Sequence, residues 1–399
     1  MIPISFLCSI ILFALMQKTP LNRATSWIVG IKYMLIPKES LNKYSKPDKQ
    51  VLSQKNKQTK SLDIIYLKRK IVKEDLLGMP YTNDLIYLWS SFLAGVGSLL
   101  VCISLGFLGI AAVQNEVNNF IAVAFGFFFV FLRFGIVSSF NRAMHRRFAV
   151  AYGLLFSVLS FLILRRVGLG IFEFRPSLLL YLEMPQLFLD LIISVLLGIL
   201  GYSLSTPMLY ELFAYQMIKK KPAAIIPFDF ASKYYNKRIP SLRRTTTSIF
   251  TFTPLVPLLI MVSSRFLTMD HSDLIFSIIF FAIEVVFAIL KLKSVKVKAQ
   301  ILTFNSYKGV IEYNYYRTYD FGKQALANLN RALLMVPVSE VALSIHPMMA
   351  IFFATAFASS FVMTGLTSII LRHTSLFLMT AIDFILAGYR IFNLFMTIE

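Results

Sequence analysis

The feature that most constrains this chain is a series of long apolar runs separated by short, mostly basic gaps. A helix needs about 20 apolar residues to cross the roughly 30 Å hydrocarbon core of a bilayer. Soluble domains do not need many such runs, and about a quarter of their residues are charged, whereas only 15% are charged here. The pattern therefore predicts an all-α polytopic membrane protein rather than two or three soluble domains.

The apolar runs predict about nine transmembrane helices. The first is a short N-terminal anchor over residues 1–16, because no basic residue precedes the run and no small-residue cleavage pattern follows it. The second part, residues 85–399, is predicted to hold eight more helices. We expect these spans at 85–113, 117–140, 148–164, 187–213, 246–264, 274–290, 333–364 and 374–398.

The positions of the basic residues predict the orientation of these spans, because cytoplasmic loops are enriched in Lys and Arg. If the N-terminus lies outside and the spans alternate, the inside loops are 17–84, 141–147, 214–245 and 291–332. Together they hold 33 of the chain's 40 Lys and Arg residues. We therefore expect the N-terminus outside and the C-terminus in the cytoplasm.

Residues 17–84 differ from the rest of the chain, since they contain 14 Lys or Arg and 6 Asp or Glu residues. Their centre, at 38–60, is polar and has almost no bulky apolar side chains. Such a segment buries too little surface to offset the entropy lost on ordering. The prediction is a basic, largely flexible cytoplasmic loop with short helices at either end.

The sequence contains none of the soluble catalytic signatures that we sought. There is no P-loop, dinucleotide-binding glycine motif, zinc-protease motif or nucleophile elbow. The two cysteines, Cys8 and Cys102, both lie in apolar runs, which disfavours a disulfide framework or a cysteine zinc site. We therefore predict no enzyme activity, no cofactor and no metal. An intramembrane enzyme acting on lipid is the weakest alternative. It would need a cluster of His and acidic residues facing one cavity, and only Glu340 with His346 comes near this.

The candidate functional residues are ionisable groups at membrane depth. Each costs at least about 2.5–3.5 kcal/mol at mid-bilayer on insertion scales, so such groups pair inside the bundle or line a wet cavity. One interpretation is structural, with Arg133 pairing with Glu284 or Asp190 to fix helix register. The other is functional, with the groups lining an ion or proton path. The predicted polar network comprises Arg133, Asp190, Glu284, Glu340, His346, Asp383 and Arg390.

Four prolines fall inside predicted spans and are candidate helix breaks. Proline supplies no backbone N–H and therefore leaves a carbonyl without its helical donor. Broken helices recur at transporter binding sites, although simple kinks are more common. The four are Pro207, Pro254, Pro257 and Pro347.

The basic inner loops 214–245 and 291–332 also carry tyrosines and phenylalanines. Aromatic and basic side chains together suit the headgroup layer of a membrane. Basic clusters next to a membrane attract anionic lipids by about 1 kcal/mol per charge. We therefore expect anionic inner-leaflet lipids as partners here and no nucleic acid. Lys291, Lys293, Lys296 and Lys298 are predicted to continue a helix out of the membrane.

The order of several short features along the chain resembles the transmembrane protein 161 family of eukaryotic polytopic proteins. No single feature is specific, and their order and spacing carry the resemblance across most of the chain. Glu284 departs from it, because the resemblance leads us to expect a basic or neutral group there. The features are Met16-Gln17-Lys18, Ala24-Thr25-Ser26-Trp27, Arg133, Arg146-Arg147 followed by Phe148-Ala149-Val150-Ala151-Tyr152-Gly153, Thr206-Pro207, Thr253-Pro254-Leu255, Arg331 and His346-Pro347.

The resemblance implies a non-enzymatic multi-pass protein of the plasma membrane or an endomembrane. It further implies modulation of potassium or calcium currents, or of membrane excitability, through partners such as channels. The alternative that the residues themselves leave open is a channel or secondary transporter with a polar intramembrane path. A dry bundle with paired charges would favour the modulator, and a water-filled path past the charges would favour transport.

Overall fold

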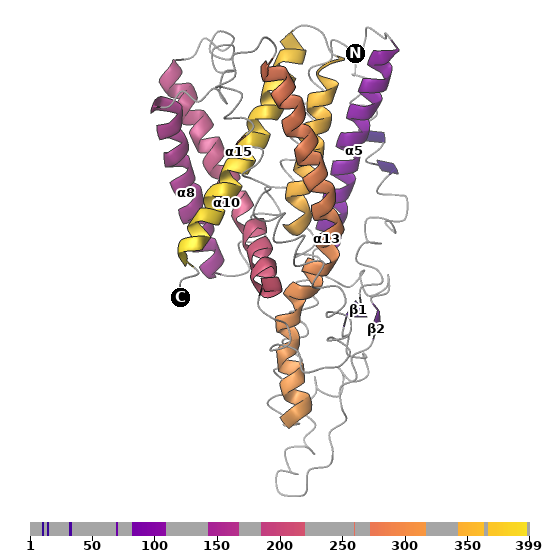
Figure 1. The fold of residues 1–399 in the computed structure, drawn as a ribbon, viewed down its shortest axis with the longest axis vertical. Helices are drawn as coiled ribbons and strands as arrows, with labels where there is room; N and C mark the ends of the chain where they lie inside the picture. The colour runs from indigo at the N-terminus through magenta and orange to yellow at the C-terminus, as the bar shows by residue number, and fades with distance from the viewer. Residues whose placement is uncertain are drawn as a thin grey trace, which may run out of the picture.

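The computed structural model describes residues 10–11, 14–15, 32–33, 69–70, 82–108, 143–166, 185–219, 259, 272–316, 342–362 and 366–396. Within these residues the chain is helical apart from one pair of two-residue strands. The helix Ala342–Ser359, which has no label in Figure 1, is named the central helix below. The labelled helices are α5 (Thr82–Phe107), α8 (Ala143–Arg166), α10 (Gln186–Lys219), α13 (Ser272–Tyr316) and α15 (Leu366–Met396).

Helices α8 and α10 lie side by side and touch through glycines (Figure 1). A Cβ atom placed on Gly153 would lie 3.0 Å from the carbonyl oxygen of Gly198. A Cβ atom placed on Gly198 would lie 2.7 Å from the Cβ of Ser157. Small residues allow backbones to approach this closely, as they do in membrane helix pairs. The two glycines therefore set the spacing of α8 and α10.

Helix α15 packs against the other side of α8 through aromatic rings. The Tyr152 hydroxyl donates a hydrogen bond of 2.7 Å to the carbonyl oxygen of Ile385 on α15. The Tyr152 ring also meets the Tyr389 ring edge-on, with centroids 5.4 Å apart. Phe156 packs against Phe384 at 5.6 Å. A buried tyrosine needs a partner for its hydroxyl, and the Ile385 carbonyl provides one.

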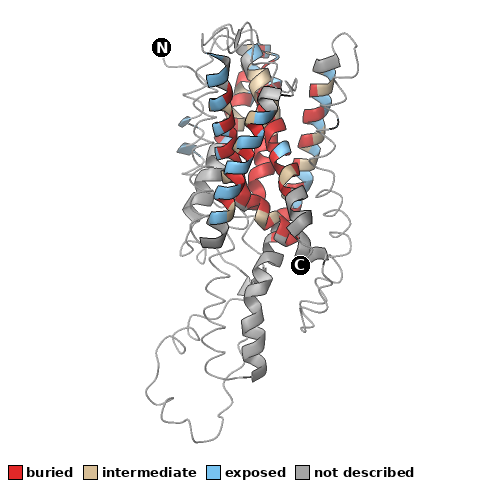
Figure 2. Cartoon of the chain, turned by 90° about the vertical axis from the view of Figure 1, so that its left-hand side faces the viewer, coloured by how far each residue is buried: buried red, intermediate tan, exposed pale blue. Residues whose placement is uncertain are grey.

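The central helix is the most enclosed element of the described bundle. Its apolar window is 78% buried, compared with 33% for that of α13. In Figure 2 the buried residues gather along the middle of the bundle, with exposed residues on its outer faces. Phe357 of the central helix packs on Phe281 of α13, with centroids 4.6 Å apart. Ser368 of α15 donates a 2.6 Å hydrogen bond to the carbonyl of Ser360, just after the central helix.

The contacts also give the relative directions of the helices. Along the central helix, His346 contacts Lys291 of α13 and Phe357 contacts Phe281, so these two helices are antiparallel. The same reasoning makes the central helix antiparallel to α15, and α8 antiparallel to α10 and α15. Helices α10, α13 and α15 therefore run one way, whereas α8 and the central helix run the other way, as alternating spans require. Which end faces the cytoplasm stays a prediction.

Three of the described helical stretches are long and apolar enough to cross a membrane: Asp190–Leu212, Leu274–Val295 and Ala342–Ser359. Two shorter apolar stretches, Phe92–Phe107 and Arg147–Leu162, accompany them. Large aliphatic side chains point outward from this bundle, including Leu154 of α8 at 65% exposure and Val286 of α13 at 57%. Exposed apolar surface on several faces is what a lipid-facing bundle presents.

These helices confirm the coarse prediction of an all-α membrane protein. The number of about nine spans stays a prediction, because the runs at 117–140 and 246–264 lie outside the described residues, apart from one residue at 259. The loop prediction for 17–84 lies mostly outside them too. Within that segment, Lys32–Tyr33 pairs antiparallel with Arg69–Lys70, a short strand pair that the sequence analysis did not predict.

Two helices extend beyond the ends of the membrane spans predicted for them. The span predicted at 274–290 belongs to a 45-residue helix, α13, which continues to Tyr316 through much of the expected inner loop 291–332. At about 1.5 Å per residue, α13 is about 67 Å long, and Figure 1 shows it extending beyond its neighbours. Helix α15 begins at Leu366 rather than 374, so Arg372 is helical, and its guanidinium lies 4.9 Å from the Phe361 ring centroid. The extension of α13 agrees with the prediction that Lys291 to Lys298 continue a helix, whereas hydropathy missed the earlier start of α15 because it registers apolar content and not helix formation.

Candidate functional site

One face of α13 carries a polar stripe that points into the bundle. Ser277, Glu284, Lys291 and Lys298 follow one another at intervals of seven residues. Seven residues make almost two helical turns, so these side chains share a face. All four are buried, and Glu284 is completely so. Because the opposite face exposes aliphatic residues such as Val286, α13 directs its ionisable groups inward and its apolar groups outward.

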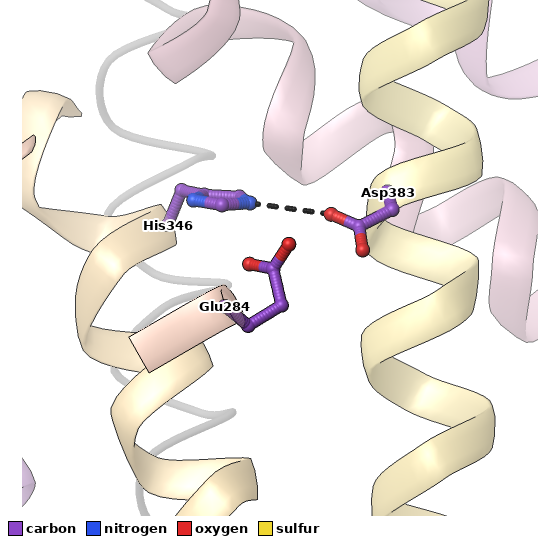
Figure 3. A group of neighbouring side chains, drawn as sticks. All are labelled: Glu284, His346 and Asp383. Atoms are coloured by element: carbon purple, nitrogen blue, oxygen red, sulfur yellow. Dashed lines mark ion pairs between the residues drawn. The ribbon is translucent and has the colours of Figure 1, made fainter. Parts of the chain in front are cut away.

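Two neighbouring helices place further ionisable groups against this stripe. His346 comes from the central helix and Asp383 from α15, and both are buried. Figure 3 shows the His346 ring, the Asp383 carboxylate and the Glu284 carboxylate pointing toward one another. One nitrogen or oxygen atom from each of the three lies within 4.8 Å of the others. Glu284 lies near the middle of the apolar stretch Leu274–Val295, so the cluster sits deep within the bundle.

Both ring nitrogens of His346 face a charged group. Lys291 Nζ lies 3.0 Å from His346 Nδ1, which is hydrogen-bond distance. His346 Nε2 lies 3.6 Å from Asp383 Oδ1, which is within ion-pair range but longer than a hydrogen bond. The imidazole therefore bridges a lysine on α13 and a carboxylate on α15. Lys291, His346 and Asp383 are named the bridged triad below.

The lysine determines which ring nitrogen of His346 carries the proton. A lysine ammonium has three donors and no acceptor, so it requires a lone pair on His346 Nδ1. A neutral imidazole then carries its proton on Nε2, and this N–H faces Asp383. In this form the bridged triad holds one positive and one negative charge, which sum to zero. Glu284 adds a second carboxylate beside it.

Two carboxylates and an imidazole are also donor types that divalent metals accept. A metal at this position would need the lone pair of His346 Nε2, because metal binds neutral imidazole through an unprotonated nitrogen. When Lys291 is an ammonium, its contact with His346 Nδ1 places the ring proton on Nε2 instead. The arrangement therefore favours proton chemistry over metal coordination.

A second buried ion pair lies further along the same stripe. Lys298 Nζ is 3.5 Å from Glu211 Oε1 of α10, and the two side chains are 3% and 12% exposed. Lys298 is seven residues from Lys291, or about 10 Å along the helix axis. Ionisable groups therefore continue from the centre of α13 toward the end at which its cytoplasmic extension is predicted.

The structure brings three of the seven predicted network residues together: Glu284, His346 and Asp383. Asp190 is buried on α10 and is not one of the three clustered residues. Arg133 and Glu340 lie outside the described residues, and so does the Arg390 side chain. The predicted pairing of Arg133 with Glu284 therefore stays a prediction.

Lys291 and Lys298 were predicted to lie on a helix that continues out of the membrane, and α13 does continue through them to Tyr316; the burial of their side chains was not predicted. Lys291 and Lys298 are each only 3% exposed, whereas Lys293 is exposed. The signal that could have found them is their seven-residue spacing from Glu284. Glu211 had no such signal, because only the packing of α10 on α13 places it near Lys298.

The candidate helix breaks at Pro207 and Pro347 were wrong, since α10 and the central helix each continue through their proline. Membrane helices tolerate proline because neighbouring groups satisfy the freed backbone. Pro347 nonetheless supplies no N–H to the Leu343 carbonyl, one turn from His346. Pro254 and Pro257 lie outside the described residues.

Fold and site together define an all-α protein with helices suited to a membrane and a buried acid, histidine and lysine cluster between three of them. No known protein family, curated protein or solved structure matches the chain. The resemblance to the transmembrane protein 161 family therefore stays a prediction based on the order of short features.

Proposed function

We propose that this chain is a multi-pass membrane protein that moves ions itself, as a channel or secondary transporter. The observation that carries the proposal is the cluster of Glu284, Lys291, His346 and Asp383, contributed by three helices and buried among apolar residues. Ionisable groups at membrane depth are expensive and commonly mark ion pathways. A bundle can be held together without them, as the glycine contact of α8 and α10 illustrates.

The predicted orientation fits this proposal. With the N-terminus outside, the end of α13 that carries Lys298 and the extension to Tyr316 faces the cytoplasm. The basic loops 214–245 and 291–332 then meet the anionic inner leaflet of the plasma membrane or an endomembrane. A cysteine introduced near Lys57 should react with an impermeant thiol reagent only after the membrane is permeabilised. Reaction from the outside of intact cells would reverse the orientation.

The test of transport is ion flux in liposomes that contain the purified full chain. We expect flux of at least one cation well above that of empty liposomes, and a loss of at least tenfold in Glu284→Gln. The matched comparison is Lys291→Gln against Lys293→Gln, which remove the same charge from one helix at a buried and an exposed position. Only the buried change should lower flux.

Equal flux in all variants would show that the buried cluster is not on the ion path. Absence of flux from folded protein, across sodium, potassium, calcium and proton assays, would overturn the proposal altogether. Folding of each variant is checked by a single symmetric elution peak in detergent and by helical circular dichroism. This check separates loss of function from loss of structure.

The second candidate is a non-enzymatic modulator of potassium or calcium currents that acts through partner proteins. The order of features shared with the transmembrane protein 161 family favours it, and the exposed aliphatic faces of α8 and α10 could receive a partner helix as well as lipid. Patch-clamp recording distinguishes the candidates. A modulator changes currents only in cells that express a channel, and Glu284→Gln should leave that effect intact.

A further inference from the structure

Glu284, His346 and Asp383 together with Lys291 indicate more than a generic ion site. We infer that the ion handled here is the proton, and that the bridged triad transfers it between α13 and α15 through the imidazole of His346. This inference rests on the proposed transport function and names its ion. It depends on the positions of Lys291 Nζ and Asp383 Oδ1 on opposite ring nitrogens.

The bridged triad has two forms that carry the same net charge. In the first, Lys291 is an ammonium, His346 carries its proton on Nε2 and Asp383 is a carboxylate. In the second, Lys291 is a neutral amine, His346 carries its proton on Nδ1 and Asp383 is a protonated acid. The first form has a positive and a negative charge, the second has none, and both sum to zero. The low dielectric of the bundle therefore does not forbid either form.

Two proton movements convert the first form into the second. The Nζ–H bond of Lys291 breaks as an Nδ1–H bond forms on His346, which gives an imidazolium. The Nε2–H bond then breaks as an O–H bond forms on Asp383. One proton has left the lysine and one has reached the carboxylate, and the imidazole has changed tautomer. The second movement needs Nε2 and Oδ1 to close from 3.6 Å to a hydrogen bond.

The surrounding groups give this transfer a direction across the bundle. Among the described residues, the charged groups facing His346 are Lys291 on α13, Asp383 on α15 and the neighbouring Glu284. Glu284 offers a second carboxylate that can exchange a proton with the Asp383 side. Lys298 lies about 10 Å from Lys291 along α13 and pairs with Glu211 of α10, so the next ionisable groups beyond Lys291 are on this side of the triad. Protons would enter and leave the triad from these two sides.

The protonation of His346 also bears on the alternative interpretation, in which the same residues hold a divalent cation. A divalent cation held by Glu284, His346 and Asp383 would require a lone pair on His346 Nε2, which only the second form provides. Metal transport therefore predicts a change from the Nε2–H to the Nδ1–H tautomer when the metal is added, whereas proton transfer alone predicts no such change. The two alternatives differ in a spectroscopic signature as well as in flux.

The test uses the full chain in liposomes that contain a pH-sensitive dye, with a potassium gradient and valinomycin imposing the membrane potential. We expect proton entry well above that of empty liposomes. His346→Gln should lower it at least tenfold, because an amide keeps hydrogen-bonding groups but cannot pass a proton. Lys291→Gln should also lower it at least tenfold, and Lys293→Gln should change it less than twofold.

The outcomes separate this inference from the proposed function. Flux of sodium, potassium or calcium with no proton movement would support the proposed transport function and overturn the inference that the ion is the proton. No flux of any ion would remove both. A third outcome is that zinc or manganese binds stoichiometrically to the wild type but not to His346→Gln, and also crosses the membrane. That result would overturn the inference, because the transported ion would be a metal ion and not the proton.

A second measurement does not require the His346 and Lys291 variants to fold. Nitrogen-15 spectra of the histidines in the wild-type protein at neutral pH should show one ring with its proton on Nε2, assigned to His346 by comparison with single substitutions of the other three histidines. An Nδ1–H tautomer in metal-free protein would mean that the second form predominates and would also fit the inference, whereas an imidazolium with both nitrogens protonated would leave Nδ1 no lone pair for the Lys291 proton and would overturn it.

Discussion

Two regions of this bundle differ in the contacts that join their helices. Helices α8 and α10 meet through Gly153 and Gly198, with their backbones in contact. The central helix meets α13 through the Phe281–Phe357 ring contact, and it meets both α13 and α15 through the bridged triad and Glu284. The first region shows that close packing alone can hold helices of this chain together. The charges in the second region are not required for helix association of this kind, and the proposed ion movement would give them a role.

The largest expected effect is on stability in the charged region. Lys291→Met removes the cation of the bridged triad and leaves the Asp383 carboxylate without it. Removing one member of a buried charge pair costs about 3–5 kcal/mol, so we expect the free energy of unfolding to fall by about 3 kcal/mol. Titration of the detergent-solubilised protein with a denaturing detergent, followed by circular dichroism, measures this change.

The companion to Lys291→Met is the double variant that adds Asp383→Asn. Removing both charges should restore at least half of the lost stability, because neutral replacement of a buried pair is often tolerated. Proton flux should stay at background in the double variant. Recovery of flux together with stability would mean that the charges serve folding alone, and the contrast between the two regions would disappear.

A smaller effect is expected in the glycine-packed region. Gly198→Ala places a Cβ 2.7 Å from Ser157 Cβ and 2.9 Å from the Gly153 carbonyl oxygen, so the backbones must separate. Overpacking of this kind costs about 1–3 kcal/mol. The matched control is Gly388→Ala on α15, where the new Cβ lies 3.4 Å from the Tyr152 hydroxyl, an ordinary contact.

Gly388→Ala should be neutral or slightly stabilising, because alanine favours helix by about 1 kcal/mol over glycine. Both variants are compared by the same unfolding titration, and proton flux per folded molecule should be unchanged in both. If Gly198→Ala were as stable as Gly388→Ala, the close approach of α8 and α10 would not be what holds them together.

The sequence predicted what depends on composition and local pattern. Apolar runs of sufficient length identified helices suited to a membrane, and insertion cost singled out Glu284, His346 and Asp383 as residues that need partners. Partner choice depends on which helices pack together, and no local pattern encodes that. Lys291 was therefore predicted only to continue a helix out of the membrane, although its spacing from Glu284 places it on the buried face, and Glu211 was not considered at all.

The smallest expected effect tests whether the two regions are independent. The Tyr152 hydroxyl of α8 donates a 2.7 Å hydrogen bond to the Ile385 carbonyl, two residues from Asp383. Tyr152→Phe removes this bond and should lower the free energy of unfolding by about 0.5–1.5 kcal/mol. If packing and ion movement are separate tasks, proton flux should change less than twofold. A fivefold or larger loss of flux from folded Tyr152→Phe would show that α8 positions Asp383 within the bridged triad. The apolar pair would then be part of the ion-handling unit rather than its support.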